Sequence, residues 1–300
     1  MQPFEGVLTC LVTPFHPGGG TDLDSLASLV KRLSEARVSG IILFDRLAET
    51  DHLSENEMLE IQRAAVRAAG KKTPVIVAMR EADSKKAAWR AQWAAGEGAD
   101  SLLVGVPHTL PPESQLNLEL FRAVRKAVSI PVILDYDSPS PDSPADPSSD
   151  GLLTAYVEID SVRVEAVPAG PVISALRERS SGHIAILSGL DGRLMLDSLD
   201  RGAVGVTPGC STPEIFSSIL KYHGANARDE AERLWVEFLP LLCLMTQSPA
   251  LHAACEKILL AKRGWIASDA TRQASPGPDA KHRADLFRHL ESLARHLGSA

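Results

Sequence analysis

The chain has 300 residues, the size of one large α/β barrel or of two average domains. Its composition, 44% hydrophobic and 23% charged, is typical of a soluble globular protein. A net charge of -7 argues against a surface that binds nucleic acid, so we expect no nucleic acid partner.

The N-terminal stretch MQPFEGVLTCLVTPF has no basic segment and no apolar run of the roughly 18 residues that a membrane span needs. We therefore expect a cytoplasmic protein with no membrane partner. The four cysteines, Cys10, Cys210, Cys243 and Cys255, show no CxxC motif and no His/Cys spacing of a zinc site. The sequence accordingly predicts no metal and no cofactor.

Short apolar runs rich in β-branched residues predict eight strands. They span 6–12, 40–44, 74–79, 101–106, 131–136, 161–167, 184–189 and 202–209. Between them, apolar residues recur at i, i+3, i+4 and i+7, which indicates helices that lie on a sheet. These predicted helices span 23–38, 54–69, 84–98, 113–128, 170–179 and 192–202.

Strict alternation of strands and helices predicts parallel strands joined by crossover helices. Eight such units of roughly thirty residues fit a (β/α)8 TIM barrel better than two domains. Four additional C-terminal helices are predicted at 213–224, 227–245, 249–264 and 281–297. We expect residues 1–224 to form the barrel and residues 225–300 to form a helical extension packed on it.

Local signals support these elements. Ser54 and Glu57 have the spacing of a capping box, and Asp22 and Ser84 are predicted N-caps. The segment SPSPDSPADPSSDG, at 138–151, is too rich in proline for a helix or a central strand. It is either a disordered connection or a flap over the barrel mouth, because loops after strands lie on the catalytic face of this fold.

Four stretches carry a family resemblance: GVLTCLVTPF, GIILFDRLAETDHLSENE, PVILDYDSP and LSGLDGRLMLDSLDRGAVGV. In order along the chain, they resemble the first strand, the G-T-T-G-E and L-S-x-x-E segment, the Y-N-x-P strand and the last two strands of one family. That family is the dihydrodipicolinate synthase / N-acetylneuraminate lyase family of (β/α)8 enzymes. The likeness covers nearly the whole chain.

The resemblance implies class I aldolase or lyase chemistry. A lysine on the sixth strand forms a Schiff base with a 2-keto acid, and a tyrosine on the fifth strand carries the proton. It puts Tyr136 at the tyrosine and Arg163 at the lysine. A guanidinium stays protonated and offers no nucleophilic lone pair, so the Schiff-base route is closed at this position. The remaining lysines are predicted on helices or at the N-terminal side of strands, away from the mouth.

Other positions also depart from the family pattern. Arg46 and Leu47 replace its two threonines, and His108 stands in its P-Y-Y segment. The arginine that follows Y-N-x-P in the synthases is absent, which speaks against dihydrodipicolinate synthase in particular. Tyr136 and Glu49 are retained.

Side chains of alternate strand residues share a face, so Arg163 and Glu165 are predicted to point together into the barrel. With Tyr136 they are the candidate catalytic residues. The candidate ligand-binding residues at the carboxyl ends of the strands are Arg46, Glu49, Arg80, His108 and Asp191. Arg163 and Glu165 form either an internal ion pair that fills the barrel, or a site in which Arg163 anchors an anion.

Three functions remain open. The first is a pseudo-aldolase that binds a small anionic metabolite such as a 2-keto acid. The second is an active lyase or hydro-lyase that acts on a 2-keto acid or sugar acid by a non-imine mechanism. The third is a purely structural protein with an occluded barrel. The resemblance also implies a homodimer or homotetramer.

Overall fold

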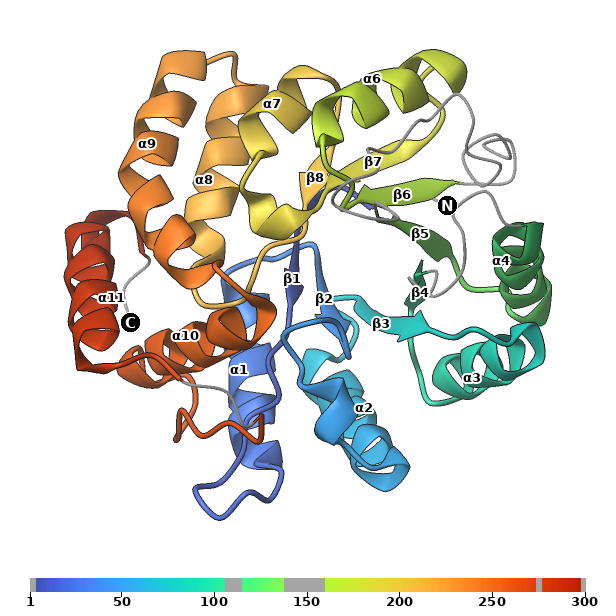
Figure 1. Cartoon of the computed structure of the whole chain (residues 1–300), viewed down its shortest axis with the longest axis horizontal. Coiled ribbons are helices and arrows are strands. Elements are labelled where there is room, and N and C mark those ends of the chain that lie inside the picture. Colours follow the sequence, from blue (N-terminus) through green and yellow to red (C-terminus); the bar gives the residue numbers. More distant parts are fainter. Residues whose placement is uncertain (1–3, 106–114, 138–159, 274–276, 298–300) are drawn as a thin grey trace. The chain divides into compact units, whose positions relative to one another are not determined.

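The structure is a computed structural model that describes residues 4–105, 115–137, 160–273 and 277–297. Within these ranges, eight parallel strands close into a barrel in sequence order, so the predicted (β/α)8 TIM barrel is confirmed (Figure 1). The strands are β1 Gly6–Cys10, β2 Gly40–Leu43, β3 Val75–Arg80, β4 Ser101–Gly105, β5 Val132–Tyr136, β6 Ser161–Val164, β7 Ala185–Ser188 and β8 Gly205–Val206.

Seven of the eight strands lie within the predicted apolar runs and are shorter than the run, whereas β3 extends one residue beyond its run, to Arg80. The extreme case is β8, which has two residues inside the predicted span 202–209. All residues of β2, β4, β5 and β6 are buried. Strands of a parallel barrel are covered on both faces, which explains why the runs are almost continuously apolar.

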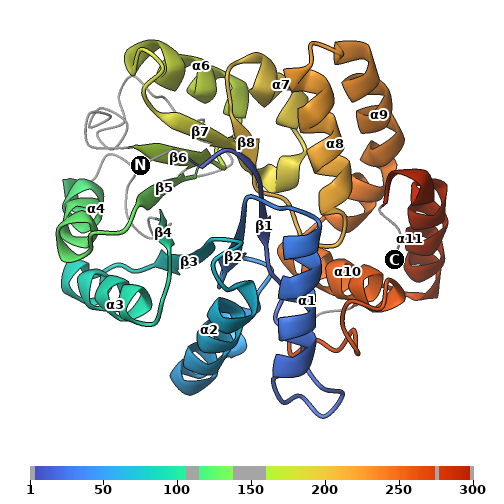
Figure 2. The same ribbon diagram turned by 180° about the vertical axis from the view of Figure 1, so that it is seen from behind.

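In the described part of the chain, a helix follows each strand except β5, and four α-helices come after β8 (Figure 2). The helices are α1 Leu23–Glu35, α2 Glu55–Ala69, α3 Ser84–Gly96, α4 Gln115–Ala127, α6 Ala169–Arg179, α7 Met195–Asp200, α8 Pro213–Gly224, α9 Arg228–Met245, α10 Pro249–Lys262 and α11 Ala280–Ser292, with 3-10 turns η1 Thr50–His52, η3 Leu190–Gly192 and η4 Ala294–His296.

The helix starts follow capping chemistry. Ser54 and Glu57 form the predicted capping box at the start of α2, and the Asp22 side chain accepts a hydrogen bond from the Ser25 N–H of α1. The N-cap of α3 is Asp83, whose carboxylate accepts from the Lys86 N–H. The prediction of Ser84 as the cap was therefore wrong by one residue. A carboxylate is as good a cap as a hydroxyl, so the two neighbours could not be ranked from the sequence.

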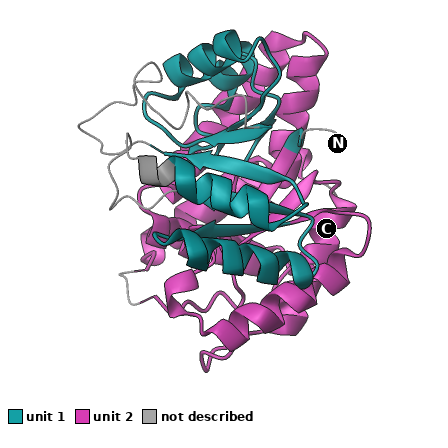
Figure 3. Ribbon diagram, turned by 90° about the vertical axis from the view of Figure 1, so that its right-hand side faces the viewer, with its two compact units in different colours: residues 1–6, 76–207 teal, residues 7–75, 208–300 magenta. Residues whose placement is uncertain are grey.

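The chain divides into two compact units (Figure 3). Unit 1 comprises residues 1–6 and 76–207, and within it α3 packs against α4. Unit 2 comprises residues 7–75 and 208–300, and within it α9 packs against α8 and α11. The C-terminal helices thus group with the first two strands. The predicted domain boundary at residue 224 stays a prediction.

No single helix in the described part of the chain is long and apolar enough to cross a membrane. The pair α9 and α10 meets the length and composition criteria only when taken together, and it is bent by 117° at the break.

Candidate functional site

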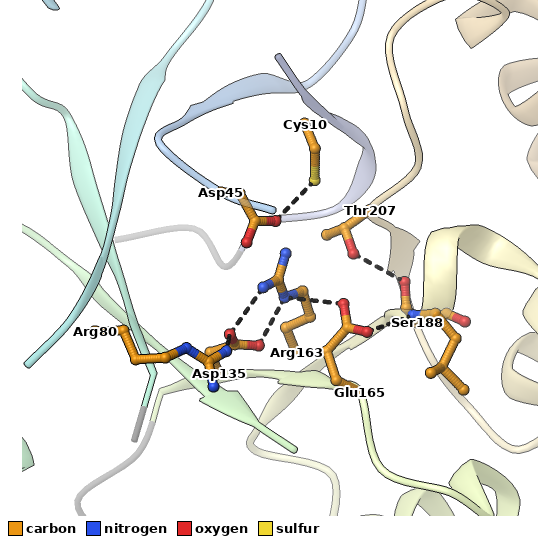
Figure 4. Close-up of polar contacts among 9 residues, drawn as sticks. Cys10, Asp45, Arg80, Asp135, Arg163, Glu165, Ser188 and Thr207 are labelled. Carbon is orange, nitrogen blue, oxygen red and sulfur yellow. Dashed lines mark hydrogen bonds and ion pairs between the residues drawn. The ribbon is translucent and has the colours of Figure 1, made fainter. Parts of the chain in front are cut away.

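One row of residues crosses four neighbouring strands of unit 1. Arg80 of β3 is in register with Gly105 of β4, Gly105 with Asp135 of β5, and Asp135 with Arg163 of β6. Register partners on adjacent strands project from the same face of the sheet. Figure 4 shows the side chains of Arg80, Asp135 and Arg163 pointing toward one another.

Arg163 and Asp135 form a two-pronged ion pair. The Arg163 Nε donates to Asp135 Oδ1 at 2.7 Å, and Nη2 donates to Asp135 Oδ2 at 2.8 Å. The Arg163 side chain is 0% exposed and that of Asp135 is 4% exposed. Parallel N–H···O bonds of this kind fix the guanidinium plane as well as its position.

Arg80 extends the cluster from β3. Its Nη2 donates to Asp135 Oδ2 at 2.8 Å, and its side chain is 29% exposed. Between the two strands, a Cβ on Gly105 would lie 2.9 Å from Arg80 Nε. The absence of a Cβ at position 105 therefore leaves room for the Arg80 side chain where it passes over β4. The structure thus joins two predicted site residues, Arg80 and Arg163, through Asp135.

Glu165 closes the other side of the cluster. Its Oε1 lies 3.3 Å from Arg163 Nε, and its Oε2 accepts from the Leu190 N–H at 2.8 Å. A Cβ on Gly189 would lie 2.6 Å from the carboxylate carbon, so glycine makes room for this carboxylate. Glu165 follows β6 instead of belonging to it, although its N–H still donates to Tyr136 O at 2.7 Å.

Of the two alternatives for Arg163 and Glu165, the structure contains the ion pair, and Asp135 is its second carboxylate. Breaking such a buried pair costs several kcal/mol, because one charge is left uncompensated. Chemically, the cluster contains a permanently protonated guanidinium and two carboxylates that accept its hydrogen bonds. It can hold charge and orient neighbours, but Arg163 cannot add to a carbonyl.

Tyr136 is the last residue of β5, and its register partner is Val164. Successive strand residues point to opposite faces, so Tyr136 projects from the face opposite Asp135 and Arg163. The β5–β6 pairing therefore does not bring the predicted catalytic tyrosine together with Arg163. The residue that it brings there is Asp135.

The other candidates on strand ends are spread along the chain. Arg46 is exposed in the loop after β2. Asp191 lies in η3, after β7, with a left-handed φ of 55°. His108 and the proline-rich segment 138–151 lie outside the described residues.

Glu49 lies in a separate cluster, within unit 2. It is buried, and its Oε1 forms an ion pair with Lys257 of α10. Its Oε2 accepts from the backbone N–H groups of Arg272 and Gln273, each at 2.7 Å. All these contacts come from the C-terminal part of the chain, more than 200 residues away. In the structure, then, Glu49 anchors α10 and the segment after it.

Lys257 corrects one sequence-based expectation. It lies on a helix, as predicted, but its amino group reaches Glu49 in the loop that follows β2. The ammonium also donates to Ala270 O at 3.0 Å and lies 4.2 Å from the centre of the Phe15 ring. Burial lowers the pKa of Lys257, and the Glu49 carboxylate opposes that shift. The prediction that every lysine lies away from the carboxyl ends of the strands was wrong here.

Arg272, in the segment that follows α10, forms further contacts with the N-terminal part of the chain. Its guanidinium stacks 4.4 Å from the centre of Phe15, and it donates to Gly19 O at 2.7 Å. Another of its nitrogens donates to the Glu57 carboxylate. That hydrogen bond, supported by the Ser54 N–H, lowers the pKa of Glu57 to about 2.

Sequence reasoning missed Asp135 and the buried charges of α10. For Asp135 the signal was available, since strand alternation and the pairing of neighbouring strands put it beside Arg163. In α10, every residue from His252 to Leu260 is buried. Among the buried residues of this helix, His252, Glu256 and Lys257 are the polar ones, and buried charges require partners of their own.

Comparison with known proteins gives one consistent result. Residues 3–292 match the model of the dihydrodipicolinate synthetase family. The 4-hydroxy-tetrahydrodipicolinate synthase of Parasynechococcus marenigrum (strain WH8102) is 30% identical over 286 residues, which cover 92% of this chain and 91% of that protein. The enzyme of the same name from Synechococcus sp. (strain CC9902) is 31% identical over 310 residues, covering 97% and 96%.

Solved structures agree at the level of the fold. The dihydrodipicolinate synthase of Rhodopseudomonas palustris superposes with a TM-score of 0.86 at 23% identity, covering 96% of this chain and 97% of that one. The 4-hydroxy-tetrahydrodipicolinate synthase of Methylacidiphilum fumariolicum SolV gives a TM-score of 0.82 at 24% identity, covering 97% and 98%.

Proposed function

The chain belongs to the dihydrodipicolinate synthetase family, and from that premise we propose that it is a pseudo-aldolase, a member without imine chemistry that binds a small anionic metabolite. The single observation that carries this proposal is that Arg163 is fully buried and donates two hydrogen bonds, from Nε and Nη2, to the Asp135 carboxylate.

The sixth strand carries no nucleophile for an imine. The family resemblance puts Arg163 at the position of the Schiff-base lysine on the sixth strand. An amine can lose its proton and attack a keto group, whereas a guanidinium remains charged at physiological pH. Because Nε and Nη2 both donate to one carboxylate, the side chain is also fixed in place.

In the family, the fifth strand carries the tyrosine that transfers the proton. On β5 the residue in register with Arg163 is Asp135, not Tyr136. We therefore assign the Asp135–Arg163 pair to the positions of the family's tyrosine and lysine. Two catalytic groups are replaced together by an ion pair, and each replacement compensates the other's buried charge.

The anionic ligand requires a cationic side chain that its carboxylate can reach. The Arg163 guanidinium lies between two carboxylates, so it is a poorer anchor for a ligand than the sequence suggested. Arg80 is more exposed and ends β3. We assign the contact with the carboxylate of a 2-keto acid-like ligand to Arg80, since a guanidinium recognises carboxylates well.

Borohydride trapping with pyruvate tests the imine proposal. The wild-type chain should give no covalent adduct, and neither should Arg163→Lys, because its new ammonium lies between Asp135 and Glu165. The double variant Asp135→Tyr/Arg163→Lys restores a tyrosine and a lysine and should trap pyruvate. Tyr136→Phe in that double variant is the matched control and should leave trapping unchanged.

An adduct on Lys in the wild-type chain would refute the proposal. A folded double variant that traps no pyruvate would also refute the proposal, because restoring a tyrosine and a lysine would then not restore imine formation. Steady turnover of a 2-keto acid or sugar acid by the wild-type chain, lost in Arg163→Lys, would favour the alternative of an active lyase or hydro-lyase with a non-imine mechanism.

Thermal shift tests the ligand class. Pyruvate and other small carboxylates should raise the Tm of the wild-type chain, and Arg80→Met should remove this rise while Arg46→Met keeps it. The comparison uses the ligand-induced change in Tm, because Arg80→Met also lowers the starting Tm by weakening the Asp135 cluster. A ligand at about 100 times its Kd stabilises by about 2.7 kcal/mol, which is readily measured.

The proposed function includes an oligomeric state and a cellular location. We propose a cytoplasmic homodimer or homotetramer, as the family resemblance implies. Light scattering coupled to size-exclusion chromatography measures the mass directly, and a monomer at micromolar concentration would contradict the proposed assembly.

A further inference from the structure

The segment that follows α10 lies across the loops after β1 and β2, all within unit 2. We call residues 267–273 the strap. The backbone N–H groups of Arg272 and Gln273 donate to Glu49 Oε2, in the loop after β2. The Arg272 Nε donates to Gly19 O, in the loop after β1. The strap therefore connects the last part of the chain to the first two loops.

Polar contacts hold the strap in place. Trp265 and Ile266, which come just before it, are each 5% exposed, whereas residues 267–273 are intermediate or exposed along their whole length. Segments with few buried apolar contacts open at a low free energy, because water can replace the hydrogen bonds that are lost. The strap thus differs from α10, in which every residue from His252 to Leu260 is buried.

The strap covers a buried ion pair. Glu49 is 6% exposed and Lys257 is 0% exposed, and the Lys257 ammonium donates to Ala270 O of the strap at 3.0 Å. Burial of both charges opposes closure, since each ion loses its hydration. The backbone N–H groups on Glu49 and the carbonyl on Lys257 offset that cost. Closed and open states are therefore balanced by opposing terms.

Arg272 is the side chain that latches the strap. Its guanidinium donates to Gly19 O at 2.7 Å, to His52 O at 2.8 Å and to the carboxylate of Glu57 on α2. It also stacks on the Phe15 ring. Hydrogen bonds from a charged donor are stronger than neutral ones, so one side chain supplies much of the closing energy. The Arg272 side chain is 19% exposed and that of Glu57 is 24% exposed, so water can reach the latch.

We propose that residues 267–273 form an opening strap, latched by Arg272, which covers and uncovers the Glu49–Lys257 pair while α10 stays folded. Ligand sites of (β/α)8 barrels lie at the carboxyl ends of the strands, where Glu49 follows β2. The strap therefore controls which charges unit 2 presents at that end. The inference goes beyond the proposed function and does not depend on it.

Hydrogen exchange in the full-length chain tests whether the strap opens separately. The amides of Arg272 and Gln273 should exchange faster than those of α10, at rates that low concentrations of urea leave unchanged. The amides of α10 should exchange slowly and respond to urea, because they need a larger unfolding. Equal protection and equal urea dependence for the two segments would overturn the proposal.

Acetylation of Lys257 by an amine-reactive reagent, followed by mass spectrometry, tests what opening uncovers. Relative to Lys281, whose side chain is 84% exposed, Lys257 should react slowly in the wild-type chain. Arg272→Ala should raise its rate about tenfold, as expected for the loss of a charged hydrogen-bonding group. Glu57→Gln removes one ion pair of the latch and should give a smaller rise. Arg233→Ala removes an equal charge from α9 and should leave the rate unchanged.

Each labelling result decides. An Arg272→Ala chain in which Lys257 reacts no faster than in the wild-type chain would overturn the proposal, and so would an equal rise in Arg233→Ala. If Arg272→Ala does not fold, Glu57→Gln decides by the same measurement. In every variant the exchange of the α10 amides is measured alongside, so that faster labelling through loss of α10, which would also overturn the proposal, is distinguished from opening of the strap.

Discussion

Asp135 in unit 1 and Glu49 in unit 2 are both buried carboxylates with cationic partners, but they obtain those partners in different ways. Asp135 receives Arg80 and Arg163 from strands placed next to it by the barrel register. Glu49 receives Lys257 and two backbone N–H groups from a helix and segment that return at the end of the chain. The first arrangement follows from the strand period, whereas the second depends on tertiary packing.

Removal of Arg163 should have the largest effect. Arg163→Met leaves Asp135 and Glu165 without the guanidinium between them, and breaking a buried pair in this way costs about 3–5 kcal/mol. Asp135 keeps Arg80 and Glu165 keeps the Leu190 N–H, but two buried carboxylates lose a partner at once, so we expect a loss near the upper end of that range. Urea denaturation of both chains measures the free energy of unfolding.

The matched control is Asp135→Leu/Arg163→Met, in which the pair is replaced by apolar side chains. It should be more stable than Arg163→Met alone, since buried pairs are often replaceable by well-packed hydrophobic residues. Losses from the two substitutions that simply add would contradict the buried ion pair described here.

Removal of Lys257 should cost less. In Lys257→Met, Glu49 keeps the N–H groups of Arg272 and Gln273, so its charge is still partly compensated. We expect about 3 kcal/mol, at the lower end for a broken buried pair. Glu49→Gln/Lys257→Met should recover part of this loss. If Lys257→Met proved costlier than Arg163→Met, the backbone donors would not be compensating Glu49.

Much of the fold follows from the sequence because the apolar runs and helical stripes are strong local signals. The eight strands and the capping box of Ser54 and Glu57 were predictable, and the ion pair between Arg163 and Glu165 was one of two alternatives. The resemblance puts Tyr136 at the family's tyrosine, whereas the strand register puts the neighbouring Asp135 beside Arg163. A shift of one residue moves a strand side chain to the other face, so a small error in position reverses its role.

The contacts of α10 could not be predicted in the same way. Nothing near Glu256 or Lys257 in the sequence indicates that one meets the loop after β8 and the other meets Glu49. The only sequence signal is that Glu256 and Lys257 are adjacent in a largely apolar stretch, which does not identify their partners. Glu256 and Cys210 are 46 residues apart, and Lys257 and Glu49 are 208 residues apart, so tertiary packing determines these pairs.

The smallest predicted effect concerns the exposed end of the unit 2 contacts, where Arg272 meets Glu57. Hydrogen bonds from Arg272 and then the Ser54 N–H lower the pKa of Glu57 from 4.5 to about 2. A lowered carboxyl pKa adds stability above the unfolded value, which is lost as the pH falls toward the folded value. Stability should therefore decline between pH 4.5 and about 2, and less steeply in Glu57→Gln. Urea midpoints measured across this range give both slopes. Because Glu57→Gln keeps an acceptor for the Ser54 N–H, equal slopes would mean that the Arg272 contact does not contribute to acid sensitivity.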